Sequence, residues 1–334
     1  FGEVYMGMNL ATGNLMAVKA MPLPRSSLAC EELHNEIALM KKLQHPNIVR
    51  YYGAEMDHDR GRLYIFQEWV PGGSVVDLLR KFGTLDEGVV RRYCRQMLAG
   101  LDYLHAHNII HRDIKGDNLL VNDRGVVKLA DFGASKRMGE DGTMGLVHHT
   151  MKGTPWFMAP EVLMQDTYGR KADVWSVGGT LVQMASGKPP WAETRCTTPI
   201  QLLHHMLGDP SRKPLYPEGV SPEFEELLDQ CFLRDMALRP SVGELLKSAF
   251  ARGAPGLLSS SSSSSSSMGS SGLGGGDGDP PTESEEEEEE GDRVMQNLML
   301  TMTDIDEGKE LDERGRGRKK GKGGGGGGGR RGKG

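Results

Sequence analysis

The residues His111–Asn118 have the types and the spacing that phosphoryl transfer from a nucleoside triphosphate requires. They read H-R-D-I-K-G-D-N, which places a carboxylate, cations and an amide in one short loop. Phosphoryl transfer depends on positioning more than on covalent help, so a carboxylate must orient and deprotonate the attacking hydroxyl, and Asp113 fits that role. Asn118 and Asp131 supply the hard oxygen ligands that Mg²⁺ prefers. The pattern therefore indicates a site for ATP and Mg²⁺.

Each of these elements also has a simpler interpretation, because an Asp in a polar loop is usually a turn former. The order of these motifs along the chain favours the catalytic interpretation over the turn. The loop is followed by the D-F-G run Asp131–Gly133 and then by Ala159–Glu161, as the chemistry requires. A given residue type occurs at any one position with a background frequency of about a twentieth, so each further matching residue lowers the probability of a chance match about twentyfold. At this point the sequence resembles the eukaryotic protein kinases over residues 1–250.

The resemblance implies a two-lobed α+β kinase fold. The expected parts are a small β-rich lobe at 1–70, a hinge at 68–74 and a larger helical lobe at 75–250. Phe1–Val4 matches only the end of the glycine-rich loop, so we expect a small lobe that lacks its first strand. Gly2 and Val4 would lie over the nucleotide, where a side chain at Gly2 would block the approach of the backbone.

Two further segments of the small lobe are expected to hold the phosphates. Leu15–Lys19 alternates like a strand, and its A-V-K ending resembles the kinase strand in which Ala17 contacts the nucleotide and Lys19 grips the α- and β-phosphates. Glu31–Leu43 carries a helical apolar stripe. The resemblance makes Glu36 the partner of Lys19, with Glu31 and Glu32 as alternatives.

The segment Tyr51–Val70 reads as two strands separated by the polar turn Asp57–Gly61. It runs into the breaker cluster Pro71–Ser74, which suits a hinge. An extended segment offers a hydrogen-bond donor and an acceptor to a purine edge, so the backbone of Glu68 and Val70 is predicted to meet the adenine.

Four more side chains are considered around the nucleotide. Gln67 lies at the position that guards the back of the pocket, and Leu120 would form its floor. Ser74 and Asp77 have two interpretations, since they would either reach the ribose or cap the following helix.

The larger lobe shows a capping-box pattern at Thr84 and Glu87, followed by a long helix with one apolar face. Leu119–Val121 and Val126–Leu129 read as short strands. A helix apolar nearly all round begins at Asp173, which is expected to cap the backbone of the catalytic loop. The resemblance also implies a structural ion pair between Glu161 and Arg239.

Residues in and after the catalytic loop indicate which residue type is phosphorylated and how the kinase would be regulated. Lys115 and Gly153–Pro155 are typical of serine/threonine kinases; Lys115 can neutralise charge on the transferring phosphate, and Thr154 is expected to hydrogen-bond Asp113. The segment from Gly133 to Ala159 is polar and rich in glycine. Arg112 is a partner for a phosphate on that segment, for which Thr150 is the first candidate and Thr143 the second.

Four motifs together resemble the MAP kinase kinase kinases of the MEKK group: Gly153–Glu161, His111–Asn118, His45–Gly53 and Gly187–Trp191. The chain departs from the family at Trp156–Phe157 and Ser248–Phe250. The implied substrate is a MAP kinase kinase, and an upstream kinase or GTPase is the implied activator. The alternatives are a Ste20-like or other sterile-group kinase and, in another class, a pseudokinase scaffold or a tail-mediated interaction protein.

Residues 251–334 have the composition of a disordered tail. A serine run at Ser259–Ser267, an acidic block at Glu285–Glu290 and a basic, glycine-rich end from Arg314 leave few apolar residues to offset chain entropy. Val294–Ile305 would form a short helix on a partner or remain a marginal peptide. The basic end resembles a nuclear-localisation or RNA-binding tail but lacks interleaved aromatics for stacking.

Composition, charge and cysteine spacing indicate the compartment and exclude a membrane-spanning segment. The 334 residues carry a net charge of −6. The four cysteines, at 30, 94, 196 and 231, lack metal-site spacing, which predicts reduced thiols in a reducing compartment. No apolar run is long enough to cross a bilayer. The expectation is a soluble, cytoplasmic protein without a membrane partner, and with nuclear entry only through its basic end.

Overall fold

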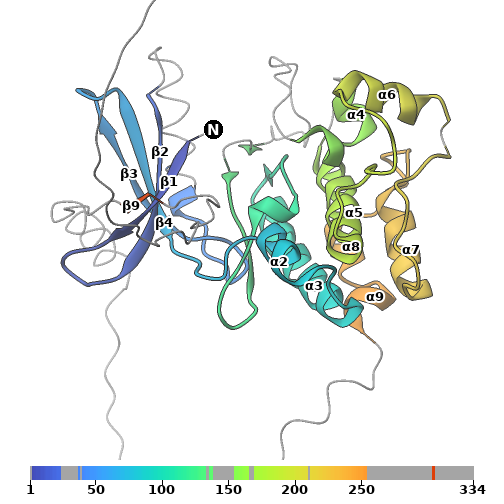
Figure 1. Cartoon of the computed structure of the whole chain (residues 1–334), viewed down its shortest axis with the longest axis horizontal. Coiled ribbons are helices and arrows are strands. Elements are labelled where there is room, and N and C mark those ends of the chain that lie inside the picture. The colour runs from blue at the N-terminus through green and yellow to red at the C-terminus, as the bar shows by residue number, and fades with distance from the viewer. Residues whose placement is uncertain are drawn as a thin grey trace, which may run out of the picture.

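A computed structural model describes residues 2–23, 37, 40–132, 135–137, 154–164, 169–209, 211–253 and 303–304. Four of the five described strands of its largest β-sheet come from the first 68 residues, and the helices α2 to α9 come from residues 75–252. The two lie side by side as separate lobes, joined through the segment between β4 and α2 (Figure 1). Within the described residues, no helix is both long and apolar enough to span a membrane.

The small lobe is an antiparallel sheet in which the described strands follow the order β3-β4-β2-β1-β9. The strands are β1 (Glu3–Met8), β2 (Leu15–Pro22), β3 (Tyr51–Asp57), β4 (Arg62–Glu68) and β9 (Thr303–Asp304). The strand predicted at Leu15–Lys19 is confirmed and continues to Pro22. The predicted turn is also confirmed, since the Arg60 N–H bonds Asp57 Oδ1 at 2.9 Å between β3 and β4.

The helix predicted at Glu31–Leu43 lies largely outside the described residues, and Glu36 is among those not described. Ile37 and Met40 are helical and buried, as the apolar stripe predicts. Ile37 packs with Leu63 and Ile65 of β4, whereas Met40 belongs to the large apolar cluster of the other lobe.

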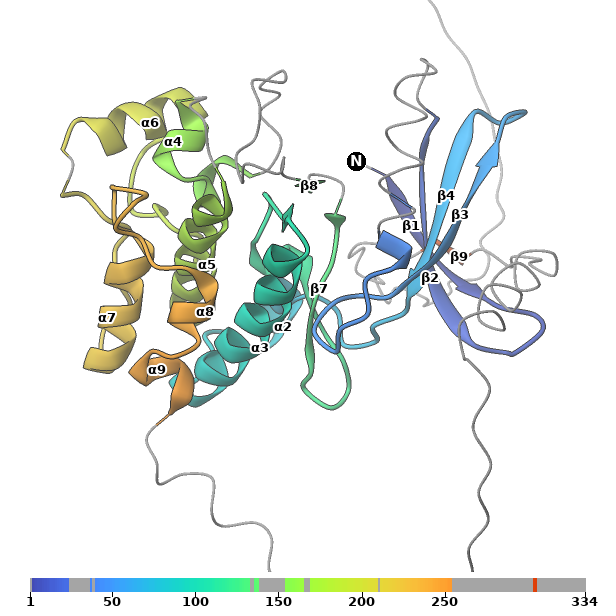
Figure 2. The same cartoon turned by 180° about the vertical axis from the view of Figure 1, so that it is seen from behind.

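The larger lobe is helical, with short strands at its border with the sheet (Figure 2). Its helices are α2 (Val75–Phe82), α3 (Glu87–Ala106), α4 (Pro160–Leu163), α5 (Arg170–Ser186), α6 (Pro199–Leu207), α7 (Pro222–Cys231), α8 (Val242–Leu245) and α9 (Ala249–Arg252). Its short elements are β5 (Ile109–Ile110), η1 (Gly116–Asn118), β6 (Leu119–Val121), β7 (Val127–Leu129), β8 (Lys136–Arg137) and η3 (Pro155–Phe157). One large apolar cluster joins α3, α5 and α7.

The start of α3 corrects one prediction. The N-cap is Asp86, whose side chain accepts from the Gly88 N–H, and not Thr84. A capping residue must directly precede the first helical residue, and Thr84 lies too early because the Leu85 N–H is bonded to the Met184 carbonyl of α5. Tertiary packing therefore decided where this helix begins. Its predicted apolar face is confirmed as buried.

Helix α5 is buried along almost its whole length, as its nearly all-apolar sequence predicts. It begins at Arg170, earlier than the predicted start, so Asp173 lies within the first turn. The side chain of Asp173 points toward the β5–η1 loop, where it meets the backbone of His111 and Arg112.

The connection between the lobes is attached to β6. The Val121 N–H bonds the Gly73 carbonyl at 2.8 Å. A Cβ at Gly72 would lie 2.1 Å from the Val121 oxygen, so only glycine permits this approach. The breaker cluster Pro71–Ser74 thus connects β4 to α2, and its two glycines hold this connection against β6.

The last helix, α9, ends at Arg252. It runs two residues past the predicted end of the kinase domain at 250. From residue 254 on, the described part of the predicted tail is β9, which pairs Thr303 with Met6 and Asp304 with Tyr5.

Candidate active site

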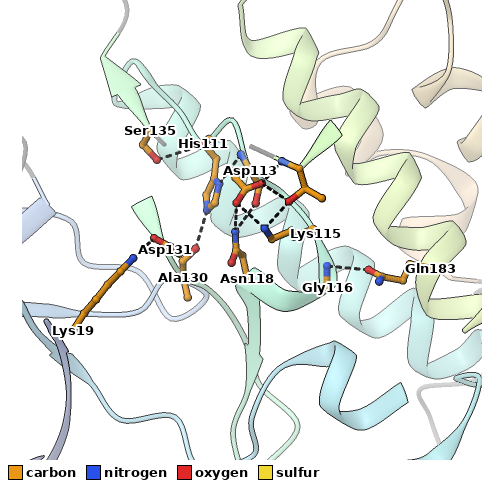
Figure 3. Close-up of polar contacts among 11 residues, drawn as sticks. Lys19, His111, Asp113, Lys115, Gly116, Asn118, Ala130, Asp131, Ser135 and Gln183 are labelled. Atoms are coloured by element: carbon orange, nitrogen blue, oxygen red, sulfur yellow. Dashed lines mark hydrogen bonds and ion pairs between the residues drawn. The ribbon is translucent and has the colours of Figure 1, made fainter. Parts of the chain in front are cut away.

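The carboxylate of Asp113 is the most heavily contacted group of the loop between β5 and β6 (Figure 3). Its Oδ1 accepts from the Thr154 N–H at 3.0 Å and from the Thr154 hydroxyl at 3.3 Å. Its Oδ2 accepts from Asn118 Nδ2 at 2.9 Å and lies 3.0 Å from Lys115 Nζ. The predicted bond between Thr154 and Asp113 is confirmed.

Lys115 contacts both Thr154 and Asp113 and so forms a second link between them. Its Nζ donates to the Thr154 hydroxyl at 2.6 Å while also meeting Asp113 Oδ2. The side chains of Lys115 and Asp113 are each only 13% exposed, so this ion pair is shielded from solvent. The three predicted residues therefore form one connected polar group.

Asp173 of α5 holds the loop from the opposite side. Its Oδ2 accepts from the His111 N–H at 2.9 Å and from His105 Nε2 at 2.8 Å, and its Oδ1 accepts from the Arg112 N–H at 2.8 Å. Burial raises the pKa of this carboxyl, but the His105 hydrogen bond and the other contacts outweigh burial and leave the pKa below its usual range. The predicted capping role is confirmed. The loop backbone is strained, since Arg112 has φ +70°.

His111 joins the loop to the segment that carries Asp131. Its Nε2 donates to the Ala130 carbonyl at 3.1 Å, and its ring lies 5.1 Å from the ring of Phe132. Burial lowers the pKa of His111, although nearby carboxylates, Asp173 above all, oppose this. A neutral imidazole suits these contacts, because its other nitrogen accepts from the Asp113 N–H at 3.4 Å.

Gln183 and His105 support the loop but were not predicted. Gln183 Oε1 accepts from the Gly116 N–H at 3.1 Å. A Cβ at Gly116 would lie 2.6 Å from that same oxygen. The available signal was a polar residue inside an otherwise buried apolar helix, because such residues are normally hydrogen-bonded.

Lys19 and Asp131 meet across the two lobes (Figure 3). Lys19 Nζ lies 2.6 Å from Asp131 Oδ1, which brings together the predicted phosphate-binding lysine and the predicted metal ligand. The pairing of Lys19 with Glu36 stays a prediction, because Glu36 lies outside the described residues. Asp131 has φ +59°, an uncommon conformation for a residue other than glycine.

Asn118 and Asp131 fit the predicted magnesium site in their chemistry. The Asn118 amide nitrogen donates to the backbone and side-chain oxygens of Asp113, so the amide oxygen is the atom left for a metal. Across the described part of the chain, no three His, Cys, Asp or Glu side chains converge on one point. Two protein oxygens suffice for Mg²⁺ that is also bound by phosphates.

The predicted adenine site is lined by apolar side chains. Val70 is buried and packs with Val49 and Ala130, and Leu120 packs against the same cluster. Ala17 is buried in β2. At Glu68, the backbone N–H bonds the Arg50 carbonyl at 2.8 Å, so its carbonyl is the group suited to a base.

The positions of Ser74, Gly2 and Val4 are also defined. Ser74 and Asp77 form a capping box at the start of α2, which is the helix-capping alternative; the ribose contact stays a prediction. Val4 pairs with Lys19 in the β1–β2 register and so lies beside it. A Cβ at Gly2 would lie 2.6 Å from the Ala20 oxygen, so this glycine has a structural requirement besides the predicted one.

The predicted phosphorylation sites Thr150 and Thr143 lie outside the described residues, so their roles stay predictions.

The predicted ion pair of Glu161 and Arg239 is confirmed, with Arg239 Nη1 2.7 Å from Glu161 Oε1. A pocket beside Asp113 is lined by residues of the catalytic loop, of η3 and of α5.

Comparisons with known proteins agree with this arrangement. The family model for the protein kinase domain matches residues 1–251. The chain is 46% identical over 260 residues to mitogen-activated protein kinase kinase kinase 3 of Arabidopsis thaliana, covering 76% of this chain and 39% of the relative. It is 43% identical over 256 residues to mitogen-activated protein kinase kinase kinase 3 of Homo sapiens, covering 75% of this chain and 40% of the relative.

A third relative extends this similarity to another lineage. Mitogen-activated protein kinase kinase kinase A of Dictyostelium discoideum is 41% identical over 258 residues, which cover 75% of this chain and 26% of the relative. The chain thus matches two fifths or less of the length of these relatives, and the matched part is the region of the site described above.

Proposed function

This chain belongs to the protein kinase family, and we propose that it transfers the γ-phosphoryl group of ATP to serine or threonine residues of a MAP kinase kinase. The observation that carries the proposal is the set of contacts around Asp113. Thr154, Asn118 and Lys115 hold both carboxylate oxygens from three directions at 2.9–3.3 Å.

Asp113 is the residue that would receive the substrate hydroxyl. Its carboxylate is fixed in orientation before a substrate arrives, which lowers the entropic cost of aligning the nucleophile. The Thr154 backbone and hydroxyl hold Oδ1, and Lys115 lies beside Oδ2, where a positive charge can stabilise charge that develops on the transferred group.

The nucleotide would lie between Lys19, the Glu68–Val70 backbone and Leu120. Lys19 offers an ammonium to the phosphates, while Asn118 and Asp131 would hold Mg²⁺ through their side-chain oxygens. When bound, MgATP supplies the phosphoryl group and the metal charge that neutralises its oxygens. The apolar packing around Val70 and Leu120 offers a dry surface for the base.

The choice of substrate rests on similarity. The relatives reported above are named as kinases that act on MAP kinase kinases. Lys115 and Thr154 in contact with Asp113 support a serine or threonine acceptor. A Ste20-like kinase is not favoured, because these relatives carry the MAP kinase kinase kinase name. A pseudokinase scaffold is not favoured, because Lys19, Asp113, Asn118 and Asp131 are all present at the site.

The test is transfer of the labelled γ-phosphate of MgATP to a catalytically inactive MAP kinase kinase. We expect label on serine or threonine of the substrate. Asp113→Asn should lower the rate about 10²- to 10⁴-fold, because the oriented base is lost. Matched melting temperatures of the two proteins would show that the variant is folded.

Two results would contradict the proposal. Equal rates for the wild type and Asp113→Asn would remove Asp113 from the chemistry. ATP binding without transfer to the MAP kinase kinase or to a generic protein acceptor would favour a scaffold, whereas transfer to the generic acceptor alone would contradict only the choice of substrate.

A further inference from the structure

The edge of the small-lobe sheet is formed by a strand from the far end of the chain. Thr303 and Asp304 make up β9, which pairs antiparallel with β1 and ends the strand order β3-β4-β2-β1-β9 (Figure 1). Asp304 lies opposite Tyr5, and Thr303 lies opposite Met6. An edge strand presents backbone N–H and C=O groups that can pair with a further strand. Strand β1 therefore has a second partner besides β2, and this partner comes from the predicted tail.

The sequence around β9 matches the surface that this register puts beside it. Continuing the pairing by one residue at each end places Ile305 opposite Val4 and Met302 opposite Gly7. Val4 is 42% exposed, so an apolar neighbour would cover apolar surface there. Gly7 lies opposite Met16, which belongs to a buried cluster on the other face of the sheet. The register thus gives apolar tail residues apolar neighbours on both faces.

Neighbouring registers would place charges badly. A slip by one residue in either direction would put Asp304 or Asp306 opposite Val4 in place of Ile305. In the observed register, Asp306 would lie opposite Glu3, and two carboxylates directly opposite each other are unfavourable. The added strand is therefore expected to end at Ile305, and the observed register is favoured over its two neighbours.

The tail is long enough to reach this edge within one molecule. About 50 residues separate Arg252, the last residue of α9, from Thr303. A flexible serine- and glycine-rich chain of that length has a root-mean-square span of about 40 Å. A 250-residue domain has a radius of gyration of about 18 Å, so such a chain can pass from one lobe to the other. Tethering also raises the effective concentration of the segment, which favours a pairing too weak to hold separate molecules together.

We propose that residues 302–305 of the tail dock on the edge of β1 in the same chain and add a strand to the small-lobe sheet. The inference stands on the strand pairing and not on the proposed function. The sequence left this segment as a short helix on a partner or a marginal peptide, and β9 gives it a partner within its own chain. Because Val4 of β1 is predicted to lie over the nucleotide, the docked tail would hold the strand that covers the phosphates.

Hydrogen exchange of the whole 334-residue chain, followed by mass spectrometry, tests the pairing. The exchange rates of the β1 amides are the readout, and the β2 amides are the internal reference. Thr303→Pro removes a backbone donor and fixes φ at a value unsuited to a strand ladder. Thr303→Val keeps a residue that favours strands. Thr282→Pro is the matched control, because it places a proline in the tail outside the docked segment.

In the wild type, β1 amides that point away from β2 should be protected by β9. We expect Thr303→Pro to speed their exchange roughly two- to tenfold, the range for loss of one hydrogen bond. The β2 amides and the thermal unfolding of the variant should match the wild type. Thr303→Val and Thr282→Pro should exchange as the wild type does. Protection should also be the same at about tenfold lower protein concentration, because a pairing within one chain does not depend on concentration.

Three results would overturn the inference. Equal exchange of β1 in the wild type and Thr303→Pro would show that the tail does not pair with this edge. An equal effect of Thr282→Pro would show that the protection does not come from residues 302–305. Protection that falls on dilution would assign the pairing to the tail of a second copy of the chain.

Discussion

Buried ionisable side chains in the larger lobe fall into two kinds. Asp173 receives three hydrogen bonds, and these keep the pKa of its carboxyl low despite burial. Cys94 and Cys231 lie among apolar side chains of α3 and α7, where burial raises the pKa of both thiols, that of Cys231 to about 12. The same burial therefore leaves a charged capping group in one place and inert thiols in another.

The thiols give a prediction at this scale. At pH 8, a pKa near 12 leaves roughly one Cys231 in ten thousand as the reactive thiolate. Brief treatment of the native protein with iodoacetamide should modify Cys196, which is only half-buried, at least about tenfold faster than Cys94 or Cys231. Peptide mass spectrometry would measure the labelling.

The denatured protein is the control, since all of these thiols should then react at similar rates. Labelling of Cys231 in the native protein as fast as that of Cys196 would contradict its burial.

At the scale of elements, one ion pair links α4 to the segment between α7 and α8. Arg239 is fully buried and meets Glu161 with both terminal guanidinium nitrogens, at 2.7 and 3.3 Å. It also donates to the carbonyls of Lys171 and Leu233, and its guanidinium lies 5.2 Å from the Trp175 ring. Arg239 thus donates to one carbonyl in the first turn of α5 and to one in the segment between α7 and α8.

Removing one partner of this pair should be costly. Arg239→Met leaves the Glu161 carboxylate buried without its cation, which should lower the free energy of unfolding by about 3–5 kcal/mol. The double variant Glu161→Leu with Arg239→Met should lose less than Arg239→Met alone, because no charge is stranded. Urea unfolding followed by circular dichroism measures both.

Arg62→Met offers a matched control, since Arg62 and Glu3 form an exposed pair at 2.6 Å. Its unfolding midpoint should stay near that of the wild type. A double variant less stable than Arg239→Met would contradict the explanation by a stranded charge.

At the scale of the whole molecule, Lys19 and Asp131 connect the sheet to the larger lobe. Their side chains are 17% and 40% exposed, so the ion pair itself should contribute only about 0–1 kcal/mol to stability. Its predicted importance lies in ligand binding, because MgATP would contact both lobes through these residues.

Lys19→Met should therefore separate ligand binding from folding. At about 100 times its Kd, MgATP should stabilise the wild type by about 2.7 kcal/mol. The variant should lose most of that gain, while its unliganded melting temperature stays within a few degrees of the wild type. Differential scanning calorimetry with and without MgATP measures this.

Lys213→Met is the control, because Lys213 pairs with Asp229 at 2.6 Å in an exposed part of the larger lobe. It should keep the full stabilisation by MgATP. An equal gain in Lys19→Met would show that Lys19 does not bind the phosphates.

Local patterns were enough to predict many of these features. The alternation at Leu15–Lys19 and the apolar stripe of α3 predicted buried faces, because side-chain direction follows directly from strand and helix periods. The motif His111–Asn118 placed Asp113 near Asn118, since residues this close in one loop must lie near each other. The Glu161–Arg239 pair came from resemblance to a family and not from spacing.

Other features depended on contacts between distant residues. Thr84 and Glu87 match a capping box, yet Asp86 caps α3, because the bond from Leu85 to Met184 sets the path of the chain. Gln183 supports Gly116 across 67 positions of sequence, and no local pattern predicts such a partner.

The sequence by itself determined which reactive groups are present, the order of the motifs and the lobe to which each motif belongs. Residue types and short spacings contain that information. Only the tertiary structure decided which atoms meet: Lys19 with Asp131, and Asp113 with Thr154. These outcomes depend on how separately formed elements pack, because each joins groups that are brought together only when the sheet and the helices occupy their final positions.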